Sequence, residues 1–232
     1  MTAPEAQINN IIEFTRSSVK SKRFSHILNV VSLSHKLALA LNLNPTDAII
    51  AGYLHDCLKE EKATTLVSLA KQYQLPLDEI ELANGHLLHG PVASLIVAKK
   101  FNITNTEILN AIAYHTLGHP AMSDLAKVIF LADCLEEDRD LDYTFPIWKT
   151  LLEPRKLANA KNAKEAKNQI TIISKKKLNK KFIANINFND FNLNINRAIL
   201  VACNQNIKYL MLENKIIHPR TIKTRNYYLQ NP

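Results

Sequence analysis

Residues 48–60 read AIIAGYLHDCLKE, in which an apolar, helix-like run leads to the adjacent pair His55–Asp56. Burying an imidazole and a carboxylate together is costly unless a metal or another charge satisfies them. An adjacent His–Asp pair is weak evidence by itself, because a single polar residue on an apolar face is more often a satisfied core residue than a ligand. The pair therefore predicts a site only if the rest of the chain brings further ligands to it.

Further candidates lie in neighbouring helix-like segments. They are His26 in KRFSHILNVV (22–31), His89 in LLHGPVAS (87–94), His115 in IAYHTLG (112–118) and Asp133 in KVIFLADCLEEDR (127–139). Successive candidates are roughly one helix plus one connection apart. A helical bundle converges such residues by pointing one or two inward from each helix. Imidazole and carboxylate without thiolate suit iron, manganese or zinc, and argue against a structural zinc site.

Apolar spacing predicts an all-α fold. Ile8, Ile11 and Ile12 recur at helical intervals, as do apolar residues in the later segments, and no convincing run alternates as a strand would. Asn44 followed by Pro45 predicts the start of the helix that carries His55. A chain of 232 residues is long enough to bury one substantial core and to carry an appendage.

Charge is divided unevenly along the chain. Residues 1–154 carry 13 Lys and Arg against 18 Asp and Glu, whereas residues 155–232 carry 16 against 3. We expect a catalytic core at 1–153, a basic Lys/Asn-rich insertion at 154–196, and a C-terminal helix with a closing segment at 197–232 that returns to the core. A Lys-rich stretch attracts phosphate backbones, so weak RNA contact, or a role as an RNA- or ribosome-associated binding module, is an alternative function. A basic run is more often a solvated face.

The cysteines indicate a reducing compartment. Cys57, Cys134 and Cys203 form no C-x-x-C pair and no disulfide framework. The N-terminus lacks the pattern of a signal peptide, and no apolar run has the length needed to cross a bilayer. We therefore expect a cytoplasmic protein without a membrane partner, with a homodimer as one option.

The order His26, His55–Asp56, His89, His115, Asp133 resembles the HD-domain phosphohydrolase superfamily. Finer strings resemble its YqeK-type family over roughly 5–145 and 197–230: RFSH, LHDCLKE, LLHGPVAS, AIAYHTLGHPAMS, KVIFLADCLEEDR and the final IIHPRTIKTRNYYLQ. The range 154–196 has no counterpart in that pattern. The resemblance implies an HD-domain helical bundle and a metal-dependent hydrolase that splits diadenosine tetraphosphate symmetrically into two ADP. Deoxynucleoside triphosphates, alarmones and nucleoside monophosphates are alternative substrates, because metal ligands alone do not choose the substrate.

The resemblance also implies roles for individual residues. A divalent metal would be held by His26, His55, Asp56 and Asp133, with His55, Asp56 and Asp133 as the catalytic set. Iron is the first expectation, and manganese or cobalt are substitutes. His89 and His115 would hold a second metal or contact phosphate, so one or two ions stay open. The expected substrate contacts are Arg23, Lys59, His89, His115, Thr116, Arg139 and, from the closing segment, Ile217 and Pro219.

Two local expectations complete the site. Lys59 follows Asp56 by three residues, so on a continued helical turn both side chains face the same way. His119 stands where many members of the family carry a basic residue, and we expect it at the edge of the phosphate site.

Overall fold

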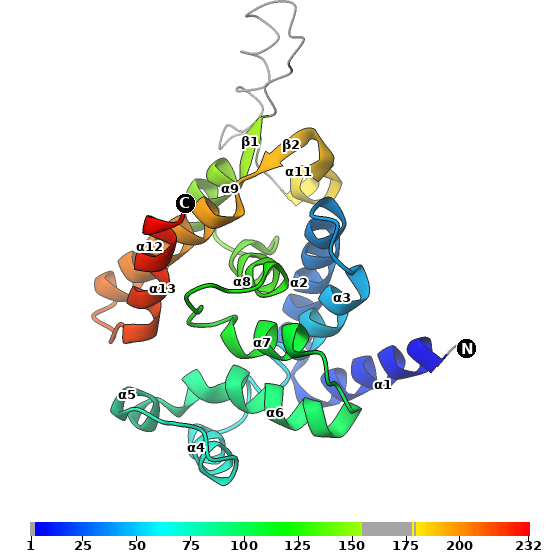
Figure 1. Ribbon diagram of the computed structural model, residues 1–232, viewed down its shortest axis with the longest axis vertical. Coiled ribbons are helices and arrows are strands. Elements are labelled where there is room, and N and C mark those ends of the chain that lie inside the picture. Colours follow the sequence, from blue (N-terminus) through cyan, green and yellow to red (C-terminus); the bar gives the residue numbers. More distant parts are fainter. Residues whose placement is uncertain (1–2, 155–177, 179) are drawn as a thin grey trace, which may run out of the picture.

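The computed structural model describes residues 3–154, 178 and 180–232, and these are almost entirely helical (Figure 1). The first helices are α1 (Ala3–Ser18), α2 (Ser21–Ala40), α3 (Pro45–Leu54), α4 (Ala63–Gln72) and α5 (Glu79–Ala83). The 3-10 turn η1 (Gly85–Leu88) leads into α6 (His89–Phe101), α7 (Thr106–Tyr114), α8 (Asp124–Leu135) and α9 (Leu141–Leu151). The C-terminal part contains β1 (Leu152–Pro154), α11 (Lys180–Asn185), η2 (Phe188–Asp190), β2 (Phe191–Leu193), α12 (Ile195–Leu212) and α13 (Pro219–Gln230). The all-α prediction is confirmed.

Helix α8 forms the centre of the molecule, and α2, α7 and α12 pack around it (Figure 1). Its residues Val128 to Leu131 are all buried, as expected for a helix that is apolar on every side. Helix α3 packs closely against α2 because Gly52 faces Val31 and Ser34: a Cβ atom at Gly52 would lie 3.0 Å from Val31 Cγ2 and 3.2 Å from Ser34 Oγ. This close contact brings the end of α3 next to the middle of α2.

The start of α3 follows the sequence prediction, but its end does not. Asn44 caps α3, since its side chain accepts a hydrogen bond from the backbone N–H of Thr46. The helix ends at Leu54, and residues 55–60 continue as turns rather than as the expected helical turn. The N–H of Lys59 donates to the carbonyl of Asp56 at 3.0 Å, so the tighter turn still places Lys59 beside Asp56.

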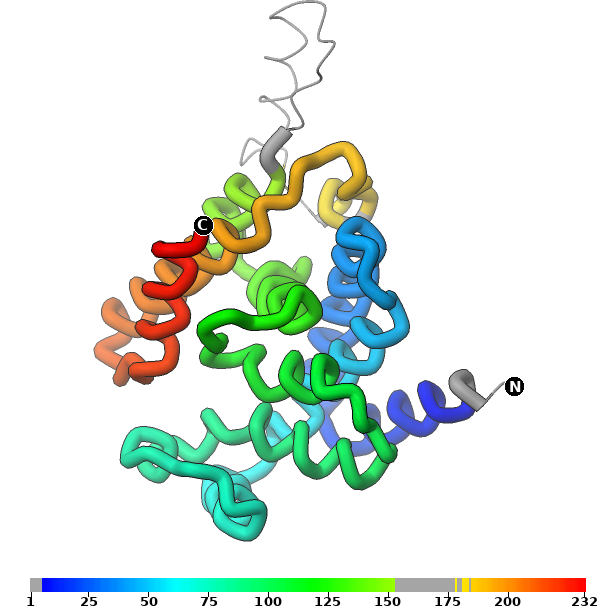
Figure 2. Tube along the Cα trace, in the orientation of Figure 1, coloured from blue at the N-terminus to red at the C-terminus, as the bar shows by residue number. Residues whose placement is uncertain are grey.

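The remaining helices form two outer groups on the central bundle. Helices α4 and α5 and the turn η1 lie beside α6, while α9, α12 and α13 pack together on the other side of α8. The tube in Figure 2 shows α13 and α1 on opposite flanks of the molecule. Among the described residues, no helix is both long and apolar enough to span a membrane.

One short antiparallel ribbon joins the two halves of the described chain. Strand β1 pairs with β2 from Leu152–Leu193 to Pro154–Phe191. Around it, Leu178, Ile183, Phe188 and Phe191 are buried in the main core. These four residues fall within the range 154–196 that we expected as an insertion. Residues 155–177 and 179, which carry much of the expected RNA contact, lie outside the described residues.

Candidate metal centre

The structure brings the six candidate ligands together from five elements. His26 lies on α2, His55 and Asp56 directly follow α3, His89 is the first residue of α6, His115 directly follows α7, and Asp133 lies on α8. Helix ends therefore supply four of the six. His55, Asp56, His89 and His115 are each at most 2% exposed, so their polar atoms face one another rather than bulk solvent.

Asp56 is the centre of this cluster, and its two oxygens face different partners. Oδ2 lies 3.7 Å from His26 Nε2 and 3.8 Å from His55 Nε2. Oδ1 lies 3.1 Å from His89 Nε2 and 3.3 Å from His115 Nε2. His26, His55 and Asp56 form one group of ligand atoms within metal-binding reach, and Asp56, His89 and His115 form a second. The two groups share the carboxylate.

Every histidine of the cluster points Nε2 inward and is held from behind through Nδ1. The Nδ1 atoms of His55, His89 and His115 lie 2.7, 2.6 and 2.8 Å from the backbone carbonyls of Gly52, His86 and Ile112. A carbonyl only accepts, so each Nδ1 carries the proton and each Nε2 of a neutral ring is a lone pair. His26 Nδ1 lies 3.3 Å from Glu136 Oε1. This arrangement, with the second ring nitrogen fixed by an oxygen, is typical of metal-ligating histidines.

The donor set fits a divalent metal. His26 Nε2, His55 Nε2 and Asp56 Oδ1 are buried atoms without a hydrogen-bond partner among the described residues. Such atoms are costly in a folded protein unless a ligand or an ion satisfies them. Asp133 lies at the edge of this set, because its Oδ1 is 3.2 Å from His26 Nε2 although it belongs to neither three-residue group. Imidazole and carboxylate ligands suit iron, manganese and zinc, so the chemistry of the donors matches the expectation.

The charge states of the ligands follow from burial and from their neighbours. Burial lowers the pKa of His55 to about 3 and that of His89 to about 4, so both rings are neutral at neutral pH. Burial alone would raise the pKa of Asp56, but its polar and cationic neighbours, Lys59 among them, hold that pKa well below its usual range. Burial also opposes charge on His26, yet Asp133 and Glu136 raise its pKa to about 9.

Cationic and hydroxyl side chains line the same cluster. Arg23 Nη1 donates to Asp56 Oδ2 at 3.0 Å, and Lys59 Nζ lies 3.1 Å from His89 Nε2 and 3.7 Å from Asp56 Oδ1. The hydroxyl of Thr116 lies within hydrogen-bond distance of His89 and His115, at 3.2 and 3.0 Å. Both cations are about one third exposed and can therefore reach a ligand from the solvent side.

Arg139 lies at the cluster but is engaged with the protein. Its Nη2 donates to Asp133 Oδ1 at 2.6 Å and its Nε donates to the Asp133 carbonyl at 3.0 Å. Although burial would raise the pKa of Asp133, the contact with His26 and the charge of Arg139 hold it well below the usual range. The guanidinium thus fixes a candidate ligand, and its side chain remains 39% exposed.

Glu136 is a site residue that the sequence reasoning missed. It is 5% exposed, and besides contacting His26 it accepts hydrogen bonds from Asn29 Nδ2 at 3.0 Å and from the Asp138 N–H at 2.9 Å. A signal was available, because Glu136 follows Asp133 by three residues and so lies about one helical turn further on the same side. Two further acidic residues follow it, which made the run resemble a solvated surface.

Gly90 allows the second half of the cluster to form. A Cβ atom at this position would lie 2.8 Å from the carbonyl oxygen of Ile112 and 3.1 Å from the ring of His115. The start of α6 therefore approaches the end of α7 only because residue 90 has no side chain. This contact sets the distance of 3.0 Å between His89 Nε2 and His115 Nε2.

The closing segment contacts α5. Ile217 and Pro219 flank His218, whose Nε2 lies 3.0 Å from Asp78 Oδ2 and 3.8 Å from Glu81 Oε1. These three residues also form a group that could hold a metal by distance. His218 Nδ1, however, accepts the N–H of Arg220, so its proton sits on Nε2 and faces the carboxylates. The group is better explained as a polar contact of His218 with the two carboxylates that fastens the start of α13 to α5.

Cys57 and Cys134 directly follow Asp56 and Asp133 and are buried free thiols. Burial raises the pKa of each thiol to about 12, so neither supplies a thiolate at neutral pH.

Residues 23–138, half of the chain, match the HD domain family, and the chain belongs to that family. A Bacillus subtilis protein named symmetrical bis(5'-nucleosyl)-tetraphosphatase is 29% identical over 212 residues, covering 91% of this chain and 92% of that protein. A Staphylococcus aureus protein of the same name is 32% identical over 54% of this chain and 64% of its own length.

Two more relatives extend the comparison. A Mycoplasma genitalium protein named probable nicotinate-nucleotide adenylyltransferase/Ap4A hydrolase is 33% identical over 56% of this chain, and the matched part is 36% of that protein. The chain thus spans less than two thirds of the Staphylococcus and Mycoplasma proteins. A crystal structure from Clostridium acetobutylicum, described as a predicted HD superfamily hydrolase involved in NAD metabolism, superposes with a TM-score of 0.71, 25% identity and 97% coverage of both chains.

Proposed function

We propose that this protein is a metal-dependent phosphoanhydride hydrolase that cleaves diadenosine tetraphosphate, or a related dinucleoside polyphosphate, symmetrically to two ADP. The observation that carries the proposal is the convergence of four inward-facing histidine Nε2 atoms on Asp56, with Arg23 and Lys59 beside them. The names of the Bacillus and Staphylococcus relatives support this choice of substrate.

In this proposal His26, His55, Asp56 and Asp133 hold the metal, with iron preferred and manganese or cobalt as substitutes. A bound divalent metal supplies a Lewis acid that lowers the pKa of coordinated water and neutralises charge on phosphoryl oxygens. The catalytic set is His55, Asp56 and Asp133. His89 and His115 either complete a second metal site with Asp56 Oδ1 or contact phosphate directly.

The cations of the cluster orient the phosphate chain. Arg23 and Lys59 now pair with Asp56, and both are exposed enough to turn towards phosphate oxygens when the carboxylate is engaged elsewhere. The Thr116 hydroxyl offers a donor between His89 and His115. Cleavage at an inner phosphorus forms one bond to the oxygen of water and breaks the anhydride bond to the leaving ADP. These donors stabilise the negative charge that develops on the leaving ADP.

The first test incubates metal-loaded protein with diadenosine tetraphosphate without oxygen and resolves the products by ion-exchange chromatography. ADP as the sole product supports symmetrical cleavage. ATP with AMP would contradict it and indicate attack at an outer anhydride. No turnover at full metal occupancy would contradict the substrate, and a panel of deoxynucleoside triphosphates, alarmones and monophosphates would then be tested.

The second test changes Asp56→Asn, which preserves shape but removes the shared charge. We expect loss of bound metal, measured by elemental analysis, and loss of turnover, with the helical circular dichroism signal retained. Asp124→Asn is the matched control, because Asp124 is an exposed residue at the start of α8 that pairs with Lys127. Full activity in the Asp56→Asn variant would overturn the site.

A further inference from the structure

An exposed apolar patch lies where α12 turns into α13. Leu212, Ile216 and Met211 are the three most exposed large apolar side chains of the described residues, at 73%, 69% and 64%. Tyr209, about one helical turn before Leu212, is also exposed. Single apolar residues scattered over a surface are normal, whereas several close together mark a surface that another molecule covers.

A defined turn, rather than fraying of a helix end, holds these side chains in solvent. Asn214 takes a left-handed backbone conformation with φ of 52°, and its N–H donates to the carbonyl of Met211 at 3.2 Å. The N–H of Lys215 donates to the carbonyl of Leu210 at 2.8 Å. These are the two hydrogen bonds of a Schellman motif, which ends a helix in one fixed conformation. A partner that covers the patch therefore loses little entropy in ordering it.

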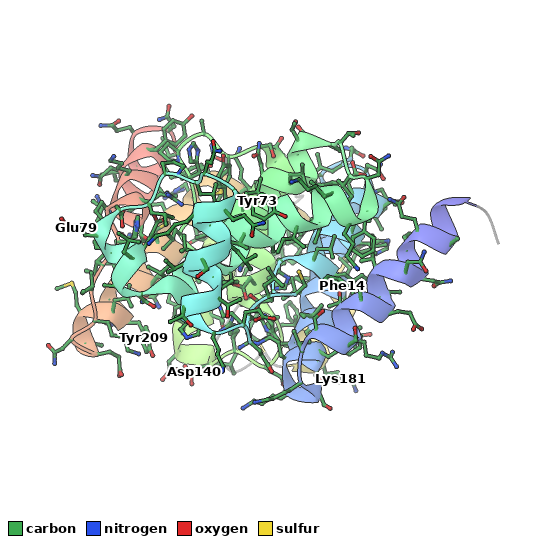
Figure 3. All side chains as sticks on the ribbon, turned by 90° about the horizontal axis from the view of Figure 1, so that it is seen from below. Phe14, Tyr73, Glu79, Asp140, Lys181 and Tyr209 are labelled. Atoms are coloured by element: carbon green, nitrogen blue, oxygen red, sulfur yellow. The ribbon has the colours of Figure 1, made fainter. Side chains whose placement is uncertain are left out.

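Helix α5 extends the patch on one side. His218 follows the turn, and its Nε2 lies 3.0 Å from Asp78 Oδ2, so α5 and the turn are neighbours. Leu82 follows Asp78 by four residues, which places it on the same side of α5, and it is 45% exposed. Figure 3 shows Glu79 of α5 and Tyr209 of α12 on one edge of the molecule, and Figure 1 shows α5 below the turn between α12 and α13. The members of the apolar patch are therefore Leu82, Tyr209, Met211, Leu212 and Ile216.

Charges of both signs surround the apolar patch. Lys208 and Lys215 are exposed on the α12 side, whereas Asp78 and Glu79 are exposed on the α5 side. Glu213 lies within the turn, and its Oε2 is 3.9 Å from Lys215 Nζ. An apolar centre inside a charged rim is the usual anatomy of a protein–protein interface. An anionic lipid surface fits less well, because it would attract the lysines but repel the carboxylates.

The separation of the two signs makes the patch complementary to itself. A two-fold axis through the apolar centre would bring the lysine side of one copy onto the acidic side of the other, and the reverse. We infer that the apolar patch is the interface through which two copies of this chain form a symmetric dimer. This assignment does not depend on the proposed hydrolase activity, and it gives a surface to the homodimer that the sequence leaves as one option.

Sedimentation equilibrium of the full chain over a range of concentrations tests the dimer. We expect the parent protein to approach twice the chain mass of 26.3 kDa. Leu212→Asp places a charge at the centre of the patch. Burial of a leucine side chain is worth at least about a factor of ten in an equilibrium constant, and a two-fold interface contains the substitution twice. We therefore expect the Kd of the dimer to rise at least about 100-fold.

Leu39→Asp is the matched control. Leu39 is 53% exposed in the last turn of α2, so both substitutions put a carboxylate near a helix C-terminus and lower stability similarly. The control should keep the Kd of the parent dimer, and thermal unfolding of both variants checks that they fold. Equal Kd values in the two variants would overturn the inference.

A monomeric parent protein would also overturn it. At about 100 µM even a dimer of micromolar affinity forms, so a monomer at that concentration has no such interface. Co-sedimentation of this monomer with phosphatidylglycerol vesicles, abolished by Leu212→Asp, would then identify a lipid surface as the occupant of the patch. Absence of vesicle binding would leave an unlike protein.

Charge reversal provides a second test that depends on the two-fold axis. One variant carries Lys208→Glu with Lys215→Glu, and the other carries Glu79→Lys. Each variant alone brings like charges together across the axis, so we expect the Kd of its own dimer to rise at least about tenfold. In an equimolar mixture both contacts across the axis join opposite charges, and the mixed dimer should exceed its statistical share.

Native mass spectrometry with one variant labelled with nitrogen-15 measures that share. Parent protein mixed with labelled parent protein is the control and should give the statistical distribution. A statistical distribution for the two variants as well would overturn the inference, because the charges would then not meet across an axis.

Discussion

Glu136 holds His26 in position from behind the metal centre. Its Oε1 lies 3.3 Å from His26 Nδ1, while Asn29 and the Asp138 N–H fix its other oxygen. Glu136→Gln keeps the shape but weakens the hold on the imidazole. Mutation of a group that holds a metal ligand from outside typically lowers metal affinity by about 10–100-fold. We therefore expect the Kd for metal, measured by competition with a chelator, to rise by that factor.

The matched control for this change is Glu137→Gln, which removes the same charge one residue further along. Glu137 is half-buried and lines a cavity between α2 and the residues after α8. We expect its metal affinity to equal that of the parent protein. If Glu136→Gln also binds metal normally, His26 does not depend on this carboxylate for its orientation.

His26 also predicts a proton signature of metal binding. Burial opposes its charge, but Asp133 and Glu136 raise its pKa to about 9, so it is protonated at pH 7.5 without metal. A ligating imidazole must be neutral, whereas His55, with its pKa lowered to about 3, has no proton to lose. We expect release of about one proton from His26 per metal at pH 7.5, and less as the pH rises through 9. Calorimetry in buffers of different ionisation enthalpy measures this release; heat independent of the buffer would contradict it.

The sequence identified the ligands more readily than the groups that support them. His26, His55, Asp56, His89, His115 and Asp133 stand out because each is a polar residue in or beside an apolar helix. Glu136 lies among other carboxylates, and only the packing of α2 against α8 selects it. The guanidinium of Arg139 forms two hydrogen bonds to Asp133, a pairing that spacing alone does not reveal, and its expected contact with phosphate stays a prediction.

At the scale of elements, the contact between α6 and α7 sets the second half of the cluster. Gly90→Ala would place a methyl group 2.8 Å from the Ile112 carbonyl and 3.1 Å from the His115 ring, so the helices must separate. We expect overpacking to lower the free energy of unfolding by about 1–3 kcal/mol. We also expect kcat to fall by more than this loss of stability explains, because His89 and His115 move apart.

A control with matched stability separates these two effects. Ala98→Gly on the same helix costs about 1 kcal/mol through helix propensity and leaves the contact with α7 intact. Thermal unfolding and steady-state kinetics are compared for both variants. Equal kcat values in Gly90→Ala and Ala98→Gly would show that the helix contact does not position the two histidines.

Helix existence was easier to predict than helix ends, for a physical reason. Apolar periodicity reports the face that packs on the core, and it correctly indicated the helix around Ile8, Ile11 and Ile12, which is α1. The end of α3 depends on tertiary contacts of His55 and Asp56, which turn the chain after Leu54 so that both side chains enter the cluster. Such contacts leave no periodic trace in the sequence.

At the scale of the whole molecule, the range 154–196 combines core packing with a strongly basic composition. Leu178 is 1% exposed and Phe188 is 4% exposed, and the Trp148 and Phe188 rings are stacked with centroids 6.2 Å apart. Composition suggested an appendage because Lys and Asn dominate the range. A few apolar residues at its end nevertheless suffice to pack against α2 and α9, and composition averages over them.

Segment 155–177 offers the test of the alternative RNA function. It carries eight basic residues and one acidic residue, so its removal lowers the net charge from +8 to +1. We expect replacement of 155–177 by a flexible Gly-Ser linker to preserve the thermal midpoint and the hydrolysis of diadenosine tetraphosphate, because the β1–β2 pairing and the buried residues from Leu178 onward remain. Salt-sensitive retention on an RNA column should disappear, since that attraction scales with the number of cations.

The control replaces the exposed Lys208, Lys215 and Lys223 by Gln, which removes positive charge from the range 197–232 instead. If basic residues act locally, this variant keeps most of its RNA retention, whereas the linker variant loses it. Equal losses would mean that RNA senses only the net charge of the molecule. Loss of hydrolysis in the linker variant at an unchanged thermal midpoint would place segment 155–177 in the catalytic unit, because stability would then not account for the effect.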